Sequence, residues 1–452
     1  MRTVLGAVLL VAWASADARP GEHPGRAAME QSGFAGAETC LACHPDAGRQ
    51  VVGSVHWTHA SKVDNVEGID KKAVHGMLNR IYTMCNGNDV INDMKEVRSD
   101  SGKVKFTGCN TCHPGNHVQG VASKGPGAEK AVDCLLCHSS EYDFRLRKGY
   151  RDEQGRVAMG RDASLKAALA VGKPGVKNCM ACHEGAGGGQ YNKRGFLFSK
   201  ETDAHAAKGM LCVDCHQGKD HRIPTGFDPN LWANDGLRLS CAGCHTEKPH
   251  KDADYNRHTA RLACQTCHTP LTGGASAKDF TRWEKQSDGF WEPSTLKHEP
   301  NETRAVYAWF NGSVKYEPHL IGPKGSRKDP KSRIFPFKVF EGKAFYDKKT
   351  GNILGMDFAP PMQTGDALAG VASAAKIQGL APYDPVPGWQ RIYFANSHLV
   401  TKTKALKCGD CHSPGGILPF PQLGYSPAEV EKLTSSRLHF EKSLEKQRAE
   451  WD

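Results

Sequence analysis

The chain has 452 residues, of which 39% are hydrophobic, and 59 lysines and arginines against 49 aspartates and glutamates give it a formal net charge of +10. This hydrophobic fraction is below the roughly 45–50% of ordinary globular chains, so side chains alone would form only a small hydrophobic core. No second run of about 18 apolar residues follows the N-terminal one, which excludes a polytopic membrane protein.

The first 16 residues have the three parts of a secretory signal peptide. Arg2 gives a basic start, Val4–Trp13 is apolar but too short to span a bilayer, and Ala14-Ser15-Ala16 supplies the small residues of a cleavage site. An uncleaved anchor helix is the alternative. We expect residues 1–16 to be removed and the mature chain to be exported to the periplasm or the outside of the cell, without a membrane span.

Cysteine spacing indicates the class of cofactor. Sixteen of the 17 cysteines fall in eight Cys-x-x-Cys-His motifs. A zinc ribbon needs no histidine after every second cysteine, and a disulfide scaffold needs no histidine at all. Two thiols at this spacing can form thioether bonds with one porphyrin while the adjacent histidine ligates its iron. The motifs therefore predict eight covalently attached c-type haems (heme c).

The eight motifs, numbered in chain order, define the expected haem attachment. The thioether residues are Cys40, Cys43, Cys109, Cys112, Cys134, Cys137, Cys179, Cys182, Cys212, Cys215, Cys241, Cys244, Cys264, Cys267, Cys408 and Cys411. The proximal iron ligands are His44, His113, His138, His183, His216, His245, His268 and His412. Eight porphyrins would supply the missing apolar core, and each ferric haem with ionised propionates would add about −1 charge, so the basic sequence does not indicate nucleic-acid binding.

The motifs are unevenly distributed along the chain. We expect a haem-dense region over residues 17–270 with seven haems, a haem-free aromatic-rich wrapping segment over 271–400, and the eighth haem with a C-terminal helix over 401–452. Residues 269–407 hold 18 of the 36 aromatic residues, with frequent Gly and Pro. This favours irregular chain wrapped over the haems, with short strands around Lys338–Tyr346, and a small separate domain is the alternative.

Short helices are expected between the motifs, and the clearest one is C-terminal. Ser426-Pro427-Ala428-Glu429 is a capping box with proline at the first helical position, and leucines alternate with charges from there to about Trp451. The irregular motif spacing disfavours a solenoid of identical repeats. The expected fold is mostly irregular with short α-helices, an all-α-leaning multihaem cytochrome c with a core of closely packed haems.

Thirteen histidines outside the motifs are candidates for the sixth iron position, and His23 is set aside because it lies near the cleaved end. His221 and His250 each follow a proximal histidine by five residues, too close to reach the far face of the same porphyrin, so we expect each to ligate the iron of another motif. The expected distal ligands are His56, His59, His117, His205, His221, His250, His258 and His398. The spare candidates are His75, His298, His319 and His439.

Several stretches of the sequence, between about residues 36 and 412, resemble the octahaem tetrathionate reductase family of c-type cytochromes. Those outside the haem motifs carry most weight, and they are Trp309-Phe310-Asn311-Gly312 and Pro336-Phe337-Lys338-Val339. The resemblance implies mostly bis-His haems and one catalytic haem, with a distal lysine after the third motif and a free cysteine nearby. By position these residues are Lys148 and Cys85, and we expect the catalytic haem at the second motif.

Two function classes remain open. The first is a reductase that passes electrons through a haem chain to tetrathionate, nitrite or hydroxylamine at the Lys148-ligated haem, with Arg145 and Arg147 favouring anionic substrates. The second is an electron carrier or conduit with every haem bis-His. As a lone cysteine in an exported chain, Cys85 is a reactive thiol, half of an intermolecular disulfide, or inert in the core. Expected partners are redox proteins, either quinol-oxidising or a small cytochrome donor, and a homo-oligomer stays open.

Overall fold

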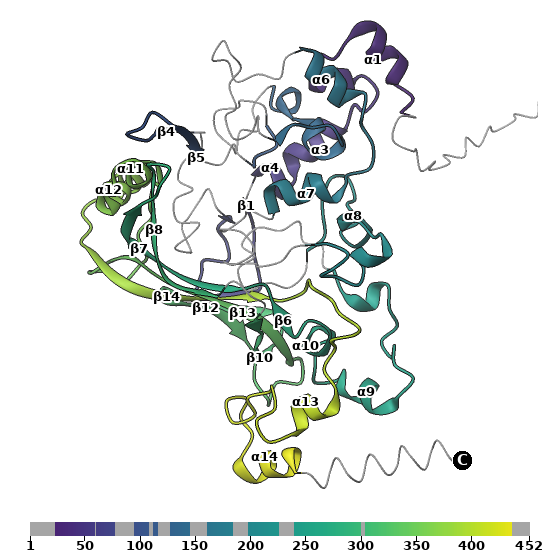
Figure 1. The fold of residues 1–452 in the computed structure, drawn as a ribbon, viewed down its shortest axis with the longest axis vertical. Helices are drawn as coiled ribbons and strands as arrows, with labels where there is room; N and C mark the ends of the chain where they lie inside the picture. The colour runs from purple at the N-terminus through teal and green to yellow at the C-terminus, as the bar shows by residue number, and fades with distance from the viewer. Residues whose placement is uncertain are drawn as a thin grey trace, which may run out of the picture.

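The computed structural model describes residues 23–58, 60–76, 95–107, 112–115, 127–144, 161–183, 198–225, 239–299 and 303–435. The expected signal peptide, and the part of the C-terminal helix beyond residue 435, lie outside these ranges. Figure 1 shows short helices arranged in a column, a curved sheet that leaves the column near its middle, and further helices at the far end of that sheet. No helix in the described ranges has the length and apolar character needed to cross a membrane.

The helices are short, as expected from the sequence. Three of them, α5, α10 and α13, consist of a haem motif and nothing else, because a helical turn places the first cysteine and the histidine, four residues apart, on one face. The helices are α1 Arg26–Ser32, α2 Ala37–Leu41, α3 Ala47–Gly53, α4 Val55–Thr58, α5 Cys134–His138, α6 Arg161–Ala168, α7 Val176–His183, α8 Cys212–Cys215, α9 Ala253–His258, α10 Cys264–His268, α11 Ala359–Thr364, α12 Ala367–Gln378, α13 Cys408–His412 and α14 Pro427–Thr434.

The capping box at Ser426 is confirmed. The Ser426 hydroxyl accepts a hydrogen bond from the Glu429 backbone N–H, and the Glu429 carboxylate accepts one from the Ser426 N–H. Helix α14 begins at Pro427, directly after this cap. It packs, through Val430 and Leu433, beside a cluster that includes the buried Cys411 of the eighth motif.

The strands form one large mixed sheet of eight strands, in the order β2-β11-β12-β14-β13-β7-β8, with β10 paired to β13. Its central pair, β13 and β14, is antiparallel from Phe337 opposite Ala395 to Asp347 opposite Pro385. The strands are β1 Ala60–Ser61, β2 Val66–Glu67, β3 His75–Gly76, β4 Lys95–Arg98, β5 Val104–Thr107, β6 Leu271–Thr272, β7 Ala275–Lys285, β8 Trp291–Glu299, β9 Thr303–Arg304, β10 Val306–Phe310, β11 Ser313–Glu317, β12 Leu320–Lys324, β13 Arg333–Asp347 and β14 Pro385–Ala395.

The sheet corrects the all-α-leaning fold expected from the sequence. The segment taken to be irregular wrapping contains nine of the strands, and the short strand expected around Lys338–Tyr346 belongs to the 15-residue β13. The sheet has a core of its own, in which Phe337, Phe340 and Ile392 are at most 1% exposed. Aromatic side chains on alternating positions can bury a sheet face without haem, and frequent Gly and Pro obscured that pattern.

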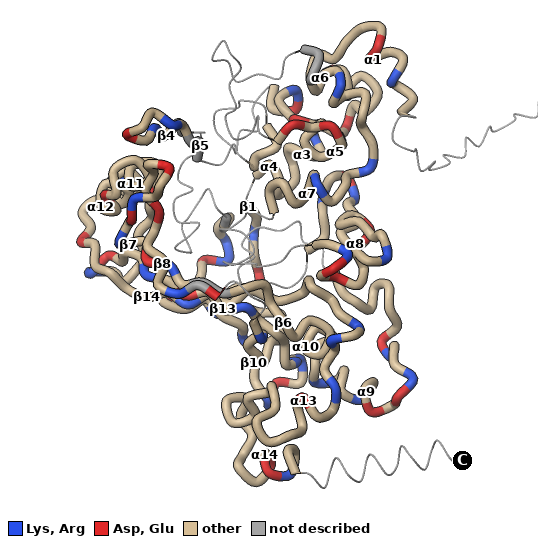
Figure 2. Tube along the Cα trace, viewed as in Figure 1, with Lys and Arg blue, Asp and Glu red and all other residues tan. Residues whose placement is uncertain are grey.

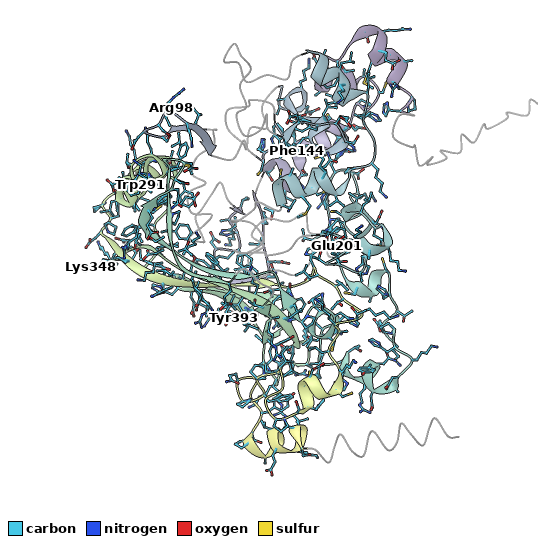
Figure 3. The ribbon with its side chains drawn as sticks, viewed as in Figure 1. Arg98, Phe144, Glu201, Trp291, Lys348 and Tyr393 are labelled. Carbon is cyan, nitrogen blue, oxygen red and sulfur yellow. The ribbon has the colours of Figure 1, made fainter. Side chains whose placement is uncertain are left out.

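The sheet also holds the seventh motif in place. The Asn396 side-chain amide, directly after β14, donates hydrogen bonds to the Thr269 and Leu271 carbonyls, and Ala263 N–H donates to the Ile334 carbonyl of β13. Helix α10, with the seventh motif, is therefore tied by hydrogen bonds to the start of β13 and to the residue that follows β14. In Figure 3, Tyr393 of β14 marks the part of the sheet near the column, and Lys348 and Trp291 mark its far end.

Candidate haem sites

Seven of the eight proximal histidines lie opposite a second histidine ring, with ring centroids 5.8–6.3 Å apart. The pairs, proximal residue first, are His44 with His23, His138 with His221, His183 with His56, His216 with His398, His245 with His205, His268 with His250, and His412 with His258.

This spacing fits an iron atom between the two rings. Two metal–nitrogen bonds of about 2.0 Å, with about 1.1 Å from each nitrogen to its ring centre, separate the centres by about 6.2 Å. The angle between the ring planes varies from 4° to 74° across the pairs, whereas the separation stays nearly constant. Ring stacking would fix the angle between the ring planes, whereas a metal ion bound by both rings would fix the separation of their centres. The residues therefore fit bis-His haem.

Backbone carbonyls orient several of these imidazoles. The Nδ1 atom of His216 lies 2.8 Å from the Pro224 oxygen, and those of His138, His268 and His412 lie 2.9–3.1 Å from other carbonyl oxygens. A ring that donates from Nδ1 presents the lone pair of Nε2 to a metal. Burial also lowers the pKa of His138 and of His221, which favours the neutral form that ligates metal.

The ring pairs join different motifs. His221 lies against His138 of the third motif, and its Nδ1 atom is 2.9 Å from the Gln50 side-chain oxygen. His250 lies against His268 of the seventh motif, with the rings nearly parallel at 4°. These positions are those that ligation across motifs requires, and ligation itself stays a prediction.

His23 was set aside in the sequence analysis, but the structure places its ring 6.2 Å from that of His44. Its nearness to the expected cleavage site was a poor reason for exclusion, since cleavage after Ala16 would keep it in the mature chain. Two spare candidates have other surroundings. His75 is buried with Nε2 2.5 Å from the Asp70 carbonyl oxygen, and His319 stacks on Tyr346 at 4.2 Å.

The second motif has a different arrangement. His113 is fully buried, its Nε2 atom is 2.9 Å from the Trp57 carbonyl oxygen, and its ring centroid is 4.6 Å from that of Trp57. Its Nδ1 atom accepts a hydrogen bond from the Gly115 N–H, whereas the Nδ1 atoms of the proximal histidines His138, His216, His268 and His412 face carbonyl oxygens. An iron on Nε2 would have to replace the Trp57 contact. The expected residues Cys85, Lys148, His59, His117 and Cys109, with the spare His439, lie outside the described residues, as does the side chain of His298.

Cysteines of successive motifs lie side by side. The thiols lie close enough to perturb each other's pKa in three pairs, Cys40 with Cys134, Cys179 with Cys212, and Cys241 with Cys264. The thiols of Cys137 and Cys179, Cys215 and Cys244, and Cys267 and Cys408 are close enough to interact electrostatically. The motifs therefore follow one another in space in the order 1, 3, 4, 5, 6, 7, 8. The second motif meets this row at the fourth, where the Cys182 sulfur is 4.0 Å from the Cys112 carbonyl oxygen.

Comparisons with known proteins agree with this geometry. The profile of the family described as "Cytochrome c bacterial" matches residues 295–415. The octaheme cytochrome c of Shewanella oneidensis has a similar solved structure, with a TM-score of 0.65 and 23% sequence identity over 87% of this chain and 94% of that one. The chain therefore has the fold of an octahaem c-type cytochrome. The structural match also confirms that the resemblance to octahaem cytochromes extends to the fold.

Curated relatives match parts of this chain. An uncharacterized protein of Archaeoglobus fulgidus is 27% identical over 45% of this chain and 80% of its own length. The dissimilatory sulfite reductase MccA of Wolinella succinogenes is 23% identical over 39% of this chain, but over only 29% of its own length. The cytochrome c-type protein NrfB of Haemophilus influenzae is 21% identical over 48% of this chain and 71% of its own length.

Proposed function

We propose that this cytochrome is an exported octahaem reductase in which seven His-paired motifs form an electron relay to a substrate site at the second motif. The observation that carries the proposal is the set of seven histidine pairs, each spaced for one iron, on motifs whose cysteines form a continuous row. Bound c-type haem supplies one-electron transfer at its iron.

The residues of the relay hold and orient their groups. The paired cysteines would hold each porphyrin covalently, and two neutral imidazoles would leave no position on the iron for another ligand. Carbonyl oxygens that accept from Nδ1 keep the rings of His138, His216 and His268 from turning. Because the same two imidazoles would ligate the iron in both oxidation states, little rearrangement would accompany each electron. These seven motifs therefore suit transfer and not substrate binding.

The second motif suits the substrate site. Its histidine, His113, is buried beside Trp57, so a group bound there is shielded from water. The resemblance to octahaem tetrathionate reductases assigns Lys148 as the distal ligand, and a lysine amine ligates only when deprotonated, which requires burial beside the metal. Arg145 and Arg147 would attract an anion, and Cys85 would line the site. The substrate class is a small oxidised sulfur or nitrogen compound, and the match to a dissimilatory sulfite reductase adds sulfite to tetrathionate, nitrite and hydroxylamine.

The test is the Lys148→Ala variant, assayed with reduced methyl viologen as the electron donor. We expect reduction of the best substrate among the four to fall by more than about tenfold, while haem content stays near eight per chain. Lys348→Ala, at the exposed far end of the sheet, is the matched control and should keep full activity.

Retention of full activity by Lys148→Ala would refute the substrate site. An electron paramagnetic resonance spectrum of the oxidised protein in which every haem is bis-His and low-spin would do the same. The seven histidine pairs would then support the second candidate function, an electron carrier without a substrate site.

A further inference from the structure

The eighth motif ends the row of motifs, opposite the first. Its helix, α13, lies in the lower part of the column in Figure 1, next to α14. Cys408 is exposed, and its sulfur is 3.9 Å from the Tyr255 hydroxyl. The Tyr255 ring in turn lies 5.5 Å from that of His250, which faces the seventh motif. An electron delivered at α13 would therefore arrive directly at the end of the relay.

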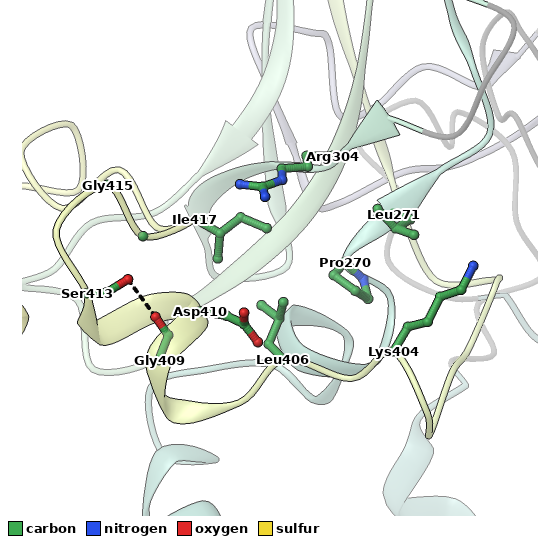
Figure 4. A pocket seen from close by; sticks show the side chains of 11 residues that line it. Pro270, Leu271, Arg304, Lys404, Leu406, Gly409, Asp410, Ser413, Gly415 and Ile417 are labelled. Atoms are coloured by element: carbon green, nitrogen blue, oxygen red, sulfur yellow. Dashed lines mark hydrogen bonds between the residues drawn. The ribbon is translucent and has the colours of Figure 1, made fainter. Parts of the chain in front are cut away.

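A pocket of about 310 Å³ opens beside α13. Figure 4 shows the side chains that line it. Leu271, Leu406 and Ile417 are apolar, Arg304 and Lys404 are cationic, and Asp410 adds one carboxylate. Protein interfaces commonly combine an apolar pocket for an anchoring side chain with a polar rim.

The surface around this pocket carries excess positive charge. Residues 399–424 contain three lysines, Lys402, Lys404 and Lys407, and one acid, Asp410. The Asp410 carboxylate accepts a hydrogen bond from the Lys407 backbone N–H within a capping box, and it offsets one of the three lysines, which leaves this segment an excess of two positive charges. Arg304 adds a further exposed cation across the pocket.

The other end of the row is balanced in charge. Around the first motif, described cations form ion pairs with acids, namely Arg26 with Glu30, Arg49 with Asp46, and Lys130 with Glu38. Figure 2 shows both signs of charge distributed along the rest of the column. The local excess of lysine therefore distinguishes the eighth motif from the first as a place for a charged partner.

From this arrangement we infer that the surface formed by the pocket beside α13 and by Lys402, Lys404, Lys407 and Arg304 docks the electron donor, a small redox protein with an acidic face. The inference rests on the proposed function, because it needs the row of motifs to be a relay. Opposite charges would steer the donor to the end of the relay, and an apolar side chain of the donor would enter the pocket. In each encounter one electron leaves the donor and one ferric iron becomes ferrous.

The experiment uses the haem-loaded cytochrome, no substrate, and the reduced form of flavodoxin, an acidic flavoprotein, as the probe. Stopped-flow absorbance of the haems gives the bimolecular rate constant. We expect this constant to fall at least about tenfold between low and high salt. The double variant Lys402→Glu/Lys407→Glu should lower it about tenfold at low salt. Lys348→Glu/Lys349→Glu changes the net charge equally at the far end of the sheet, and it should lower the rate by less than about twofold.

Equal slowing in both double variants would show that only net charge matters and would overturn the docking surface. A fall in haem content of Lys402→Glu/Lys407→Glu to about seven per chain would also overturn it, because the lysines would then hold haem propionates. The proposed reductase function has a separate test. It would be refuted if the protein accepted electrons from flavodoxin as described but reduced none of the four substrates.

Discussion

Replacing Lys338 should change the thermal stability of the protein by an amount that can be worked out from the structure. It lies on β13 opposite Phe394 of β14, its side chain is buried, and burial lowers its pKa from 10.5 to about 7. At about 1.36 kcal/mol per pKa unit, this shift corresponds to a destabilisation of about 5 kcal/mol when the amine is protonated. Because β14 leads to His398, the stability of this strand pair also bears on the fifth motif.

The pH dependence follows from proton binding. Between pH 7 and 10.5 the unfolded chain binds a proton at Lys338 that the folded chain does not, so the free energy of unfolding rises with pH across this window. Below pH 7 both states are protonated and the full destabilisation remains. Lys338→Met removes it. With an unfolding entropy of about 2.1 cal/mol/K per residue, we expect Tm to rise by about 5 °C at pH 6 and to change little at pH 10.5.

Differential scanning calorimetry of the haem-loaded protein at pH 6, 8 and 10 measures this difference. Lys343→Met is the matched control on the same strand, because Lys343 is partly exposed and lies 3.8 Å from the Asp279 carboxylate. It should give no pH-dependent gain. A lower Tm for Lys338→Met at every pH would refute the reasoning, because the buried ammonium would then contribute to stability and not cost any.

Two further predictions concern the haem sites. A pyridine haemochrome assay should give about eight haems per chain, and Cys264→Ala should lower the value by about one or prevent folding, whereas a value near four would contradict the assignment of all eight motifs. His221→Ala should convert one haem to high spin in the electron paramagnetic resonance spectrum, because His221 faces His138. His319→Ala is its control, since His319 stacks on Tyr346, and equal spectra for the two variants would exclude His221 as a ligand.

The sequence predicted the parts of the structure that depend on short motifs. The third, seventh and eighth motifs each form a short helix that ends at the motif histidine, and the cap at Ser426 begins α14 as expected. The five-residue offsets of His221 and His250 predict ligation across motifs from local chain length alone, and in the structure the two rings lie against His138 and His268.

The parts that depend on distant contacts were harder to predict. The sheet was missed because β13 pairs with β10, β14 and β7, and none of these pairings is visible in a local pattern containing Pro336 and Gly342. His23 was missed because its position relative to a cleavage site says nothing about which ring it meets. Which histidine pairs with which motif is a property of the folded chain and not of spacing.

The crossing of histidine partners between motifs has a consequence for how the chain acquires its fold. His138 meets a ring 83 residues further along, and His216 meets one 182 residues further. Such contacts close late in folding, because the entropy of closing a long loop opposes them. As the chain is extended from its N-terminus, the third motif must wait for His221, and the fifth must wait for His398. A truncation before residue 398 would therefore remove the partner of His216 in the middle of the row of motifs, as well as the eighth motif at its end.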